Sequence, residues 1–247
     1  MFPITHIWFS EKVLGVRNSL SVLGAVFPDI AIAKCLNRDQ THNCTWRLYD
    51  YLVKECSGCE DFARALVTHT VDPRGLDYYG DESFGTGNKG YCFQKAETIT
   101  VEVIEACNIP QEFGLWKAHN FIEMGIEANI AASDRTLTGS LYDALNDMRA
   151  IKKLAGCLES YYSLEKDALV AGIGYFSDFI VLEETNSHTL ACKYDIQMQA
   201  KHGISINIEA ARRIIDKCRL LVEADYDIFI EYCTEKISGM IEVKDNE

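Results

Sequence analysis

Histidine and carboxylate side chains gather in the first half of this sequence at spacings that suit metal binding. His119 lies on an apolar helical stripe, and Glu123 follows it four residues later. Residues four apart project from the same side of a helix, so this pair could bind one metal ion. A carboxylate beside an apolar face is costly to bury unless it is paired or binds a cation. A buried histidine hydrogen-bonded to a neighbouring glutamate is the alternative interpretation.

A second group of such residues ends a predicted helix and enters a long, glycine-rich loop. His69 and Asp72 are three residues apart, and Asp77 follows Pro73 within the loop. The three-residue spacing would place His69 and Asp72 on one helical face, while the loop could fold Asp77 back over the same place. Asp72 before Pro73 is also typical of a turn, so local capping is the alternative.

Three more candidates lie closer to the N-terminus. Asp29 stands among apolar residues, where the alternatives to a metal ligand are a helix cap or a buried salt bridge, and His6 and His42 flank it in sequence. The whole set contains only imidazole and carboxylate groups, the ligands that zinc and similar ions prefer. We therefore predict a metal site formed by His6, Asp29, His42, His69, Asp72, Asp77, His119 and Glu123.

The elements that would hold these residues are predicted to be helices. Apolar residues recur at three- and four-residue steps through most of the chain, and strand patterns are rare. We expect one all-α domain over 1–247, with the metal site in residues 1–132 and a helical extension over 133–247; bundles build metal sites from inward-facing side chains. The helices are predicted near 12–36, 45–56, 59–71, 92–108, 113–132, 135–161, 164–182, 188–202 and 207–238.

Composition excludes several classes of protein. The chain has 247 residues, a formal charge of −13 and ordinary hydrophobic and charged fractions, which excludes global disorder. The negative charge argues against a nucleic-acid-binding surface, because such surfaces use Lys and Arg to replace counterions.

No apolar run is long enough for a membrane span, and no basic segment precedes the first apolar residues. We therefore predict a cytoplasmic protein without an integral membrane segment, whose ten cysteines are reduced, buried thiols. Cys56 and Cys59 form a lone C-x-x-C pair.

Taken in order, these residues resemble the zinc-dependent phospholipase C family, which is related to the single-strand-specific zinc nucleases. The resemblance rests on Thr5–His6, on Gly24–Ile30 with Asp29, on His69 with a nearby aspartate, and on Ala118–Glu123. It covers roughly residues 1–130. It implies an all-α, zinc-phospholipase-C-like bundle in which two or three ions, zinc or else manganese or iron, are held by His, Asp and Glu and hydrolyse phosphodiesters.

The chain departs from the family pattern around the long loop. The family's His-x-x-x-Asp is represented by His69-x-x-Asp72, which is one residue short, so either Asp72 or Asp77 would be the bridging carboxylate. The histidine that follows in the family is absent, and Asp77 or Asp81 could replace it. These departures also leave open a different class of function, a non-catalytic helical binding or scaffold protein with a vestigial or structural metal site.

The expected chemistry is hydrolysis of a phosphate ester, most readily a phosphodiester. Two cations would lower the pKa of a bound water and stabilise charge on the phosphoryl oxygens, and Asp77 or Asp72 would orient that water. Arg74 and Lys89 are candidates for holding the substrate phosphate, and Tyr78 for lining the pocket. The expected substrate is a small phosphate-containing molecule or a phospholipid.

Overall fold

A computed structural model of the chain describes residues 1–32, 36–43, 45–180 and 184–246. Within these ranges the backbone forms helices and no β-strand, which confirms the predicted all-α fold. Residues 33–35 and 181–182, which fall within two of the predicted helices, lie outside the described residues. Among the described residues, no helix is both long enough and apolar enough to cross a lipid bilayer.

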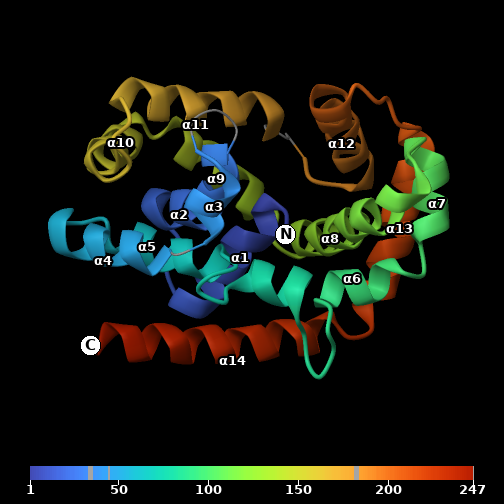
Figure 1. The fold of residues 1–247 in the computed structure, drawn as a ribbon, viewed down its shortest axis with the longest axis horizontal. Helices are drawn as coiled ribbons and strands as arrows, with labels where there is room; N and C mark the ends of the chain where they lie inside the picture. Colours follow the sequence, from blue (N-terminus) through green and yellow to red (C-terminus); the bar gives the residue numbers. More distant parts are fainter. Residues whose placement is uncertain (33–35, 44, 181–183, 247) are drawn as a thin grey trace. The chain divides into compact units, whose positions relative to one another are not determined.

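The elements follow one another with short connections (Figure 1). In chain order they are α1 (Pro3–Leu14), α2 (Ser19–Ile32), α3 (Arg38–His42), α4 (Thr45–Glu55), α5 (Glu60–His69), η1 (Tyr78–Glu82), α6 (Tyr91–Ala96), α7 (Thr100–Cys107), η2 (Gln111–Phe113), α8 (Gly114–Ser133), α9 (Thr136–Asn146), α10 (Met148–Tyr162), α11 (Lys166–Ile180), α12 (Ser187–His202), α13 (Ile208–Glu223) and α14 (Tyr226–Asp245).

Several of the long predicted helices are divided in two, and α1 begins earlier than expected. Gly15 follows α1 with a φ of +69°, a conformation that favours glycine. The Asn18 side chain then accepts hydrogen bonds from backbone N–H groups in the first turn of α2. Asp147 caps the start of α10 in the same way. Apolar spacing continues across such breaks, so helical periodicity alone does not locate them.

The contacts within the chain divide it into two compact units. Unit 1 comprises Met1–Thr5, Tyr79–Thr138 and Leu182–Glu231, and unit 2 comprises His6–Tyr78, Gly139–Val181 and Tyr232–Glu247. Each unit draws on both the first and the second half of the sequence, whereas the sequence suggested a metal-site half that ends at residue 132.

The core of unit 2 forms where α2 packs against α5 (Figure 1). Phe27 of α2 and Phe62 of α5 are both fully buried and meet edge to face, with ring centroids 5.3 Å apart. Helix α4 packs against α5, and α11 packs against α2. Close packing of this kind holds α2 and α5 rigidly, and these helices carry Asp29 and His69.

Gly24 permits the close approach of α2 to α5, and its substitution provides a test of this packing. A Cβ atom at Gly24 would lie 2.3 Å from the Phe62 carbonyl oxygen, so Gly24→Ala must move the helices apart. We expect it to lower the free energy of unfolding, measured by urea titration, by about 1–3 kcal/mol. Gly139→Ala in α9 is the matched control: a Cβ there meets nothing within 4 Å, and alanine should add up to about 1 kcal/mol of stability. Equal effects of the two substitutions would contradict the described packing.

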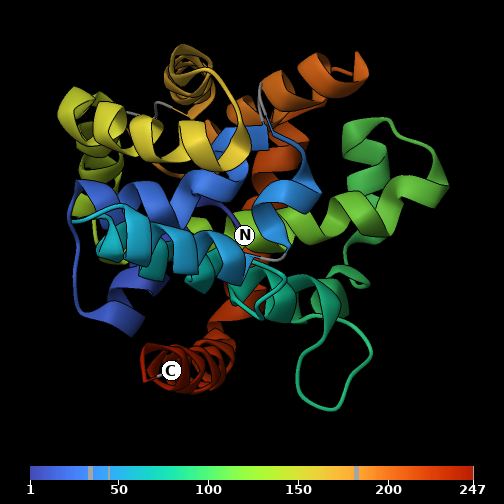
Figure 2. The same ribbon diagram turned by 60° about the vertical axis from the view of Figure 1, so that its left-hand side comes forward.

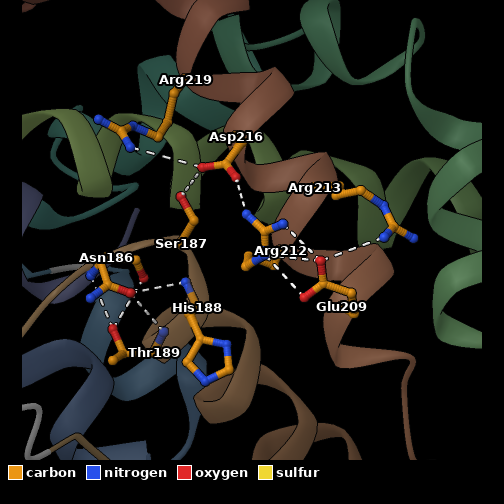
Figure 3. A network of polar contacts seen from close by, with 9 residues as sticks. All are labelled: Asn186, Ser187, His188, Thr189, Glu209, Arg212, Arg213, Asp216 and Arg219. Atoms are coloured by element: carbon orange, nitrogen blue, oxygen red, sulfur yellow. Dashed lines mark hydrogen bonds and ion pairs between the residues drawn. The ribbon is translucent and has the colours of Figure 1, made fainter.

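Unit 1 is organised around α8, which packs against α6, α7, α12 and α13. A Cβ atom at Gly125 would lie 2.8 Å from backbone and side-chain atoms of Cys218, so this glycine allows α13 to approach α8. Helices α12 and α13 are also joined by polar contacts (Figure 3). Ser187 Oγ of α12 donates to Asp216 Oδ1 of α13 at 2.6 Å, and within α13 itself Arg212 pairs with both Asp216 and Glu209.

The long loop expected over residues 72–90 contains the π-helical turn η1. Gly90 holds this turn in place, because its N–H donates to the Asp81 carbonyl at 3.1 Å and a Cβ there would lie 2.2 Å from the Gly80 carbonyl oxygen. Residues 83–89, drawn in teal-green, extend away from α6 in both views (Figures 1 and 2). Single π-helical turns are frequent at functional sites, and η1 carries Asp81.

Candidate metal centre

Five of the predicted ligands meet inside unit 2, and we refer to them as the His/Asp cluster. Each comes from a different element: α1, α2, α3, the last residue of α5, and the segment just before η1. Ligand atoms of two overlapping triplets each lie within 4.8 Å of one another. The cluster consists of His6, Asp29, His42, His69 and Asp77.

The chain reverses direction after α5 and thereby brings Asp77 back to His69. Helix α5 ends at His69 because Thr70 is extended, with ψ of 176°. The Gly75 N–H donates to the Thr70 carbonyl at 2.9 Å, which closes the turn. A Cβ at Gly75 would lie 2.6 Å from the Thr70 nitrogen, so this turn requires glycine.

Hydrogen bonds orient two of the imidazole rings so that their Nε2 atoms face the cluster. His69 Nδ1 donates to the Ala25 carbonyl at 2.6 Å, and since a carbonyl can only accept, the neutral ring has a bare Nε2. His42 Nδ1 lies 2.9 Å from Thr41 Oγ1, whose own proton can go to nearby backbone carbonyls. A ligating histidine usually makes this kind of outward Nδ1–H bond.

The three Nε2 atoms all face the buried Asp77 carboxylate. Asp77 Oδ1 lies 3.3 Å from Nε2 of His6, while Asp77 Oδ2 lies 3.4 Å from Nε2 of His69 and 3.6 Å from Nε2 of His42. Asp29 Oδ1 lies 3.8 Å from Nε2 of His42. Within the described residues, none of these Nε2 atoms makes a hydrogen bond of good geometry.

These separations match those of atoms that share a metal ion. Ligand atoms at roughly 2.1 Å from a tetrahedral ion lie about 3.4 Å from one another. The four nitrogen–oxygen distances in the cluster, 3.3 to 3.8 Å, lie close to this value and beyond the usual hydrogen-bond range. The residues therefore fit a divalent ion that prefers imidazole and carboxylate ligands, such as zinc, manganese or iron.

The electrostatics of the cluster favour neutral imidazoles and charged carboxylates. Burial, together with the neighbouring His69, lowers the pKa of His6 to about 3 and that of His42 to about 4. Burial alone would raise the pKa of Asp77, but His69 and His6 help to hold it well below its usual range. The pKa of Asp29 is lowered by His69 and His42, also against the effect of burial. Neutral histidine and ionised aspartate are the metal-binding forms.

Asp72 does not join the cluster, which corrects the prediction that it shares a helical face with His69. Helix α5 ends at His69, so three-residue spacing no longer applies beyond it. The Asp72 side chain is exposed, and its carbonyl accepts hydrogen bonds from the backbone N–H and hydroxyl of Thr45. Of the two carboxylates considered, Asp77 is the one that faces the histidines.

The two residues predicted to bind phosphate, Arg74 and Lys89, lie in different units of the structure. Arg74 is exposed in unit 2, and its guanidinium lies 4.8 Å from the ring centre of Tyr78, next to Asp77. Lys89 belongs to unit 1, where its ammonium group pairs with Glu97 at 2.5 Å. The structure thus brings Arg74 and Tyr78 together, and it gives Lys89 a different partner.

A second group of possible ligands lies in unit 1 and includes the predicted His119 and Glu123. Their ligand atoms and one from Asp81 lie within 4.8 Å of one another, and both predicted side chains are buried. The His119 ring stacks on Phe93 at 4.3 Å and meets Trp116 edge to face. We refer to Asp81, His119 and Glu123 as the α8 triad.

Sequence reasoning missed Glu127, the residue that holds the start of α1 in unit 1. Its carboxylate is 1% exposed and accepts hydrogen bonds from the backbone N–H groups of Ile4 and Thr5 at 2.9 and 2.7 Å. These amides belong to the first turn of a helix and have no partner within it. Burial raises the pKa of Glu127 despite these bonds. Its spacing of four residues from Glu123, on a buried face, was the signal available in the sequence.

Comparison of the chain with models of protein families, with curated proteins and with solved structures finds no match in any of the three.

Proposed function

We propose that this protein is a metal-dependent hydrolase of phosphate esters, most readily of phosphodiesters. The observation that carries the proposal is the convergence of three imidazole Nε2 atoms on the two oxygens of one buried carboxylate, Asp77. The resemblance to zinc-dependent phospholipases C supports the same reaction class. The His/Asp cluster would hold one or two ions and the α8 triad one more, two or three in all.

The residues of the His/Asp cluster would have two tasks, which are to bind metal and to orient water. Divalent ions bound there would supply a water of lowered pKa and positive charge for the phosphoryl oxygens. Asp77 directs its two oxygens at different histidines, so it would hold a divalent ion together with these imidazoles. Asp29 is 33% exposed on its side chain, so its charged carboxylate can accept a hydrogen bond from an incoming water and orient that water.

A phosphate group could be held beside this cluster by Arg74. Its guanidinium is exposed and stacks on Tyr78, which leaves N–H groups free to bind two phosphate oxygens at once. The position of Arg74 in the turn that carries Asp77 supports this role. The proposed substrate is a small phosphate ester or a phospholipid headgroup.

Burial of the cluster also favours the alternative function, a structural metal site in a binding or scaffold protein. The side chains of His6, His42, His69 and Asp77 are each at most 5% exposed, as in closed structural sites. The partial exposure of Asp29 favours the enzyme. Turnover of substrate distinguishes the two functions, because a structural site binds metal without any.

The test is hydrolysis of bis(p-nitrophenyl) phosphate by protein loaded with zinc or manganese. We expect turnover that falls at least about 100-fold in His69→Ala, since the loss of a metal ligand removes both water activation and charge stabilisation. His119→Ala reports whether the α8 triad takes part. His188→Ala is the control, because this histidine is exposed and belongs to neither group. Stoichiometric metal without turnover would contradict the enzyme and support the structural site.

A further inference from the structure

Unit 2 also contains a group of three thiols, which its fold assembles from two distant segments. Cys56 and Cys59 flank the turn between α4 and α5, where the Cys59 N–H donates to the Cys56 carbonyl at 3.1 Å. Gly58 within this turn has a φ of +74°, and its carbonyl accepts a hydrogen bond from Lys153 of α10 at 2.9 Å. Four residues after Lys153, one helical turn along, α10 presents Cys157 to the same turn.

The sulfur atoms of Cys59 and Cys157 lie 3.9 Å apart, within the reach of a thiol–thiol hydrogen bond. Cys59 is fully buried and Cys157 is half-buried. Both are free thiols. A disulfide bond has a length of about 2.05 Å, so side-chain rotations that bring the sulfur atoms about 2 Å closer would allow a bond.

The arrangement favours disulfide formation over metal binding. Three thiolates that bind one ion converge on a point. Among the described residues, the groups whose ligand atoms converge in this way contain histidine and carboxylate, and the three thiols are not one of them. Burial raises the pKa of Cys56 to about 12 and that of Cys59 to about 11, which keeps both protonated and slow to react with reagents in solution. The half-buried Cys157 is therefore the point of entry.

We propose that Cys59 and Cys157 are a redox-modification site that forms a reversible disulfide with a small disulfide such as oxidised glutathione. Cys157 loses its proton to solvent, and its sulfur attacks one sulfur of glutathione disulfide, which releases one glutathione thiolate and leaves a mixed disulfide. Cys59 then loses its proton, and its sulfur attacks the Cys157 sulfur, which releases the second glutathione. The protein loses two electrons and two protons, and glutathione disulfide is reduced to two thiols.

The bond would join two elements that are far apart in sequence. Cys59 and Cys157 are separated by 98 residues, and a cross-link that closes a long loop restricts the unfolded chain most. The oxidised protein should therefore unfold at a higher temperature than the reduced protein. The same α5 helix carries His69 at its other end, but the proposal does not depend on the proposed hydrolase function.

The experiment is equilibration of the full chain in glutathione buffers of increasing oxidised fraction, followed by acid quenching and peptide mass spectrometry. We expect a peptide pair cross-linked through Cys59 and Cys157, a thermal midpoint raised by several degrees, and reversal of both by excess dithiothreitol. Cys192, which is half-buried in unit 1, is the internal reference for a thiol that glutathione can modify. Modification of Cys192 without the Cys59–Cys157 cross-link would overturn the proposal.

Single substitutions distinguish the pair from other uses of these thiols. In Cys59→Ser the reaction should stop at glutathione bound to Cys157, and in Cys157→Ser Cys59 should stay unmodified. Cys56→Ser should still form the cross-link. The matched control is Cys233→Ser, a buried cysteine of unit 2 outside the group, which should leave the cross-link unchanged.

A dominant cross-link between Cys56 and Cys157 would contradict the assignment. Because Cys59→Ser could impair folding, Cys157→Ser at the half-buried position repeats the test.

Discussion

Asp77→Asn is expected to remove tightly bound metal from the His/Asp cluster while the protein stays folded. Asparagine has nearly the same shape as aspartate, but it lacks the negative charge, and only one of its two polar atoms can bind a cation. Both Asp77 oxygens face histidine nitrogens at 3.3 to 3.6 Å. Since changes in groups that merely support a ligand cost about 10–100-fold in affinity, we expect a larger loss here. Isothermal titration of chelator-treated protein with zinc measures it, and circular dichroism checks the fold.

Asp72→Asn is the matched control, because Asp72 lies in the same loop and has an exposed side chain. It should bind zinc as the unsubstituted protein does. The opposite pattern, with metal lost in Asp72→Asn and kept in Asp77→Asn, would contradict the described geometry and restore the spacing argument for Asp72. Two variants that both bind zinc normally would place the metal elsewhere, for example at the α8 triad.

The helical fold could be predicted from the sequence because apolar periodicity records which residues are buried. Leu154 and Leu158 of α10 and Ile214 and Cys218 of α13 lie on the predicted stripes and are buried. The points at which helices end were harder to predict, because they depend on single residues. Gly15 is an example: its positive φ interrupts a stretch whose apolar pattern continues.

Local spacing predicted one part of the candidate site and failed in another. His119 and Glu123 lie within one helix, where four-residue spacing applies directly, and both are buried in the α8 triad. The three-residue spacing of His69 and Asp72 predicted a shared helical face in the same way. However, α5 ends at His69 and the chain reverses through Gly75. This turn places Asp77, eight residues along the chain, beside His69, whereas within a helix residues eight apart would be separated by about 12 Å.

Contacts between distant segments could not be predicted from spacing at all. Cys56 and Cys59 formed a lone C-x-x-C pair in the sequence, and nothing there indicated that α10 brings Cys157 to it. Glu127 looked like one more acidic residue of α8, yet it holds the first turn of α1. In each case the partner lies about 100 residues or more away, and only the packing of helices decides which residues meet.

Acidification from about pH 7.5 to about 5.5 is expected to destabilise the metal-free protein, because two histidines of the cluster are buried as neutral rings. Burial, with His69 nearby, lowers the pKa of His6 to about 3 and that of His42 to about 4 in the folded state, whereas both are near 6.5 in the unfolded chain. Below about pH 6.5 the unfolded state therefore binds more protons. The contribution of these rings to stability is complete above that pH and is lost progressively towards pH 4.

The slope of this dependence is the quantity to measure. Each histidine that is neutral only in the folded state contributes up to about 1.4 kcal/mol per pH unit to the free energy of unfolding. Urea titrations across this range should show a smaller slope in His42→Asn, with the difference approaching one such increment at the acidic end, while His188→Asn, at an exposed position, leaves the slope unchanged. An unchanged slope in His42→Asn would mean that this ring titrates normally in the folded state.

Because the folded-state pKa values of His6 and His42 lie near 3 and 4, protons should not compete with zinc for these two rings above about pH 5. The ratio of zinc dissociation constants between His42→Asn and the unsubstituted protein should then stay constant over the same range in which folding stability falls.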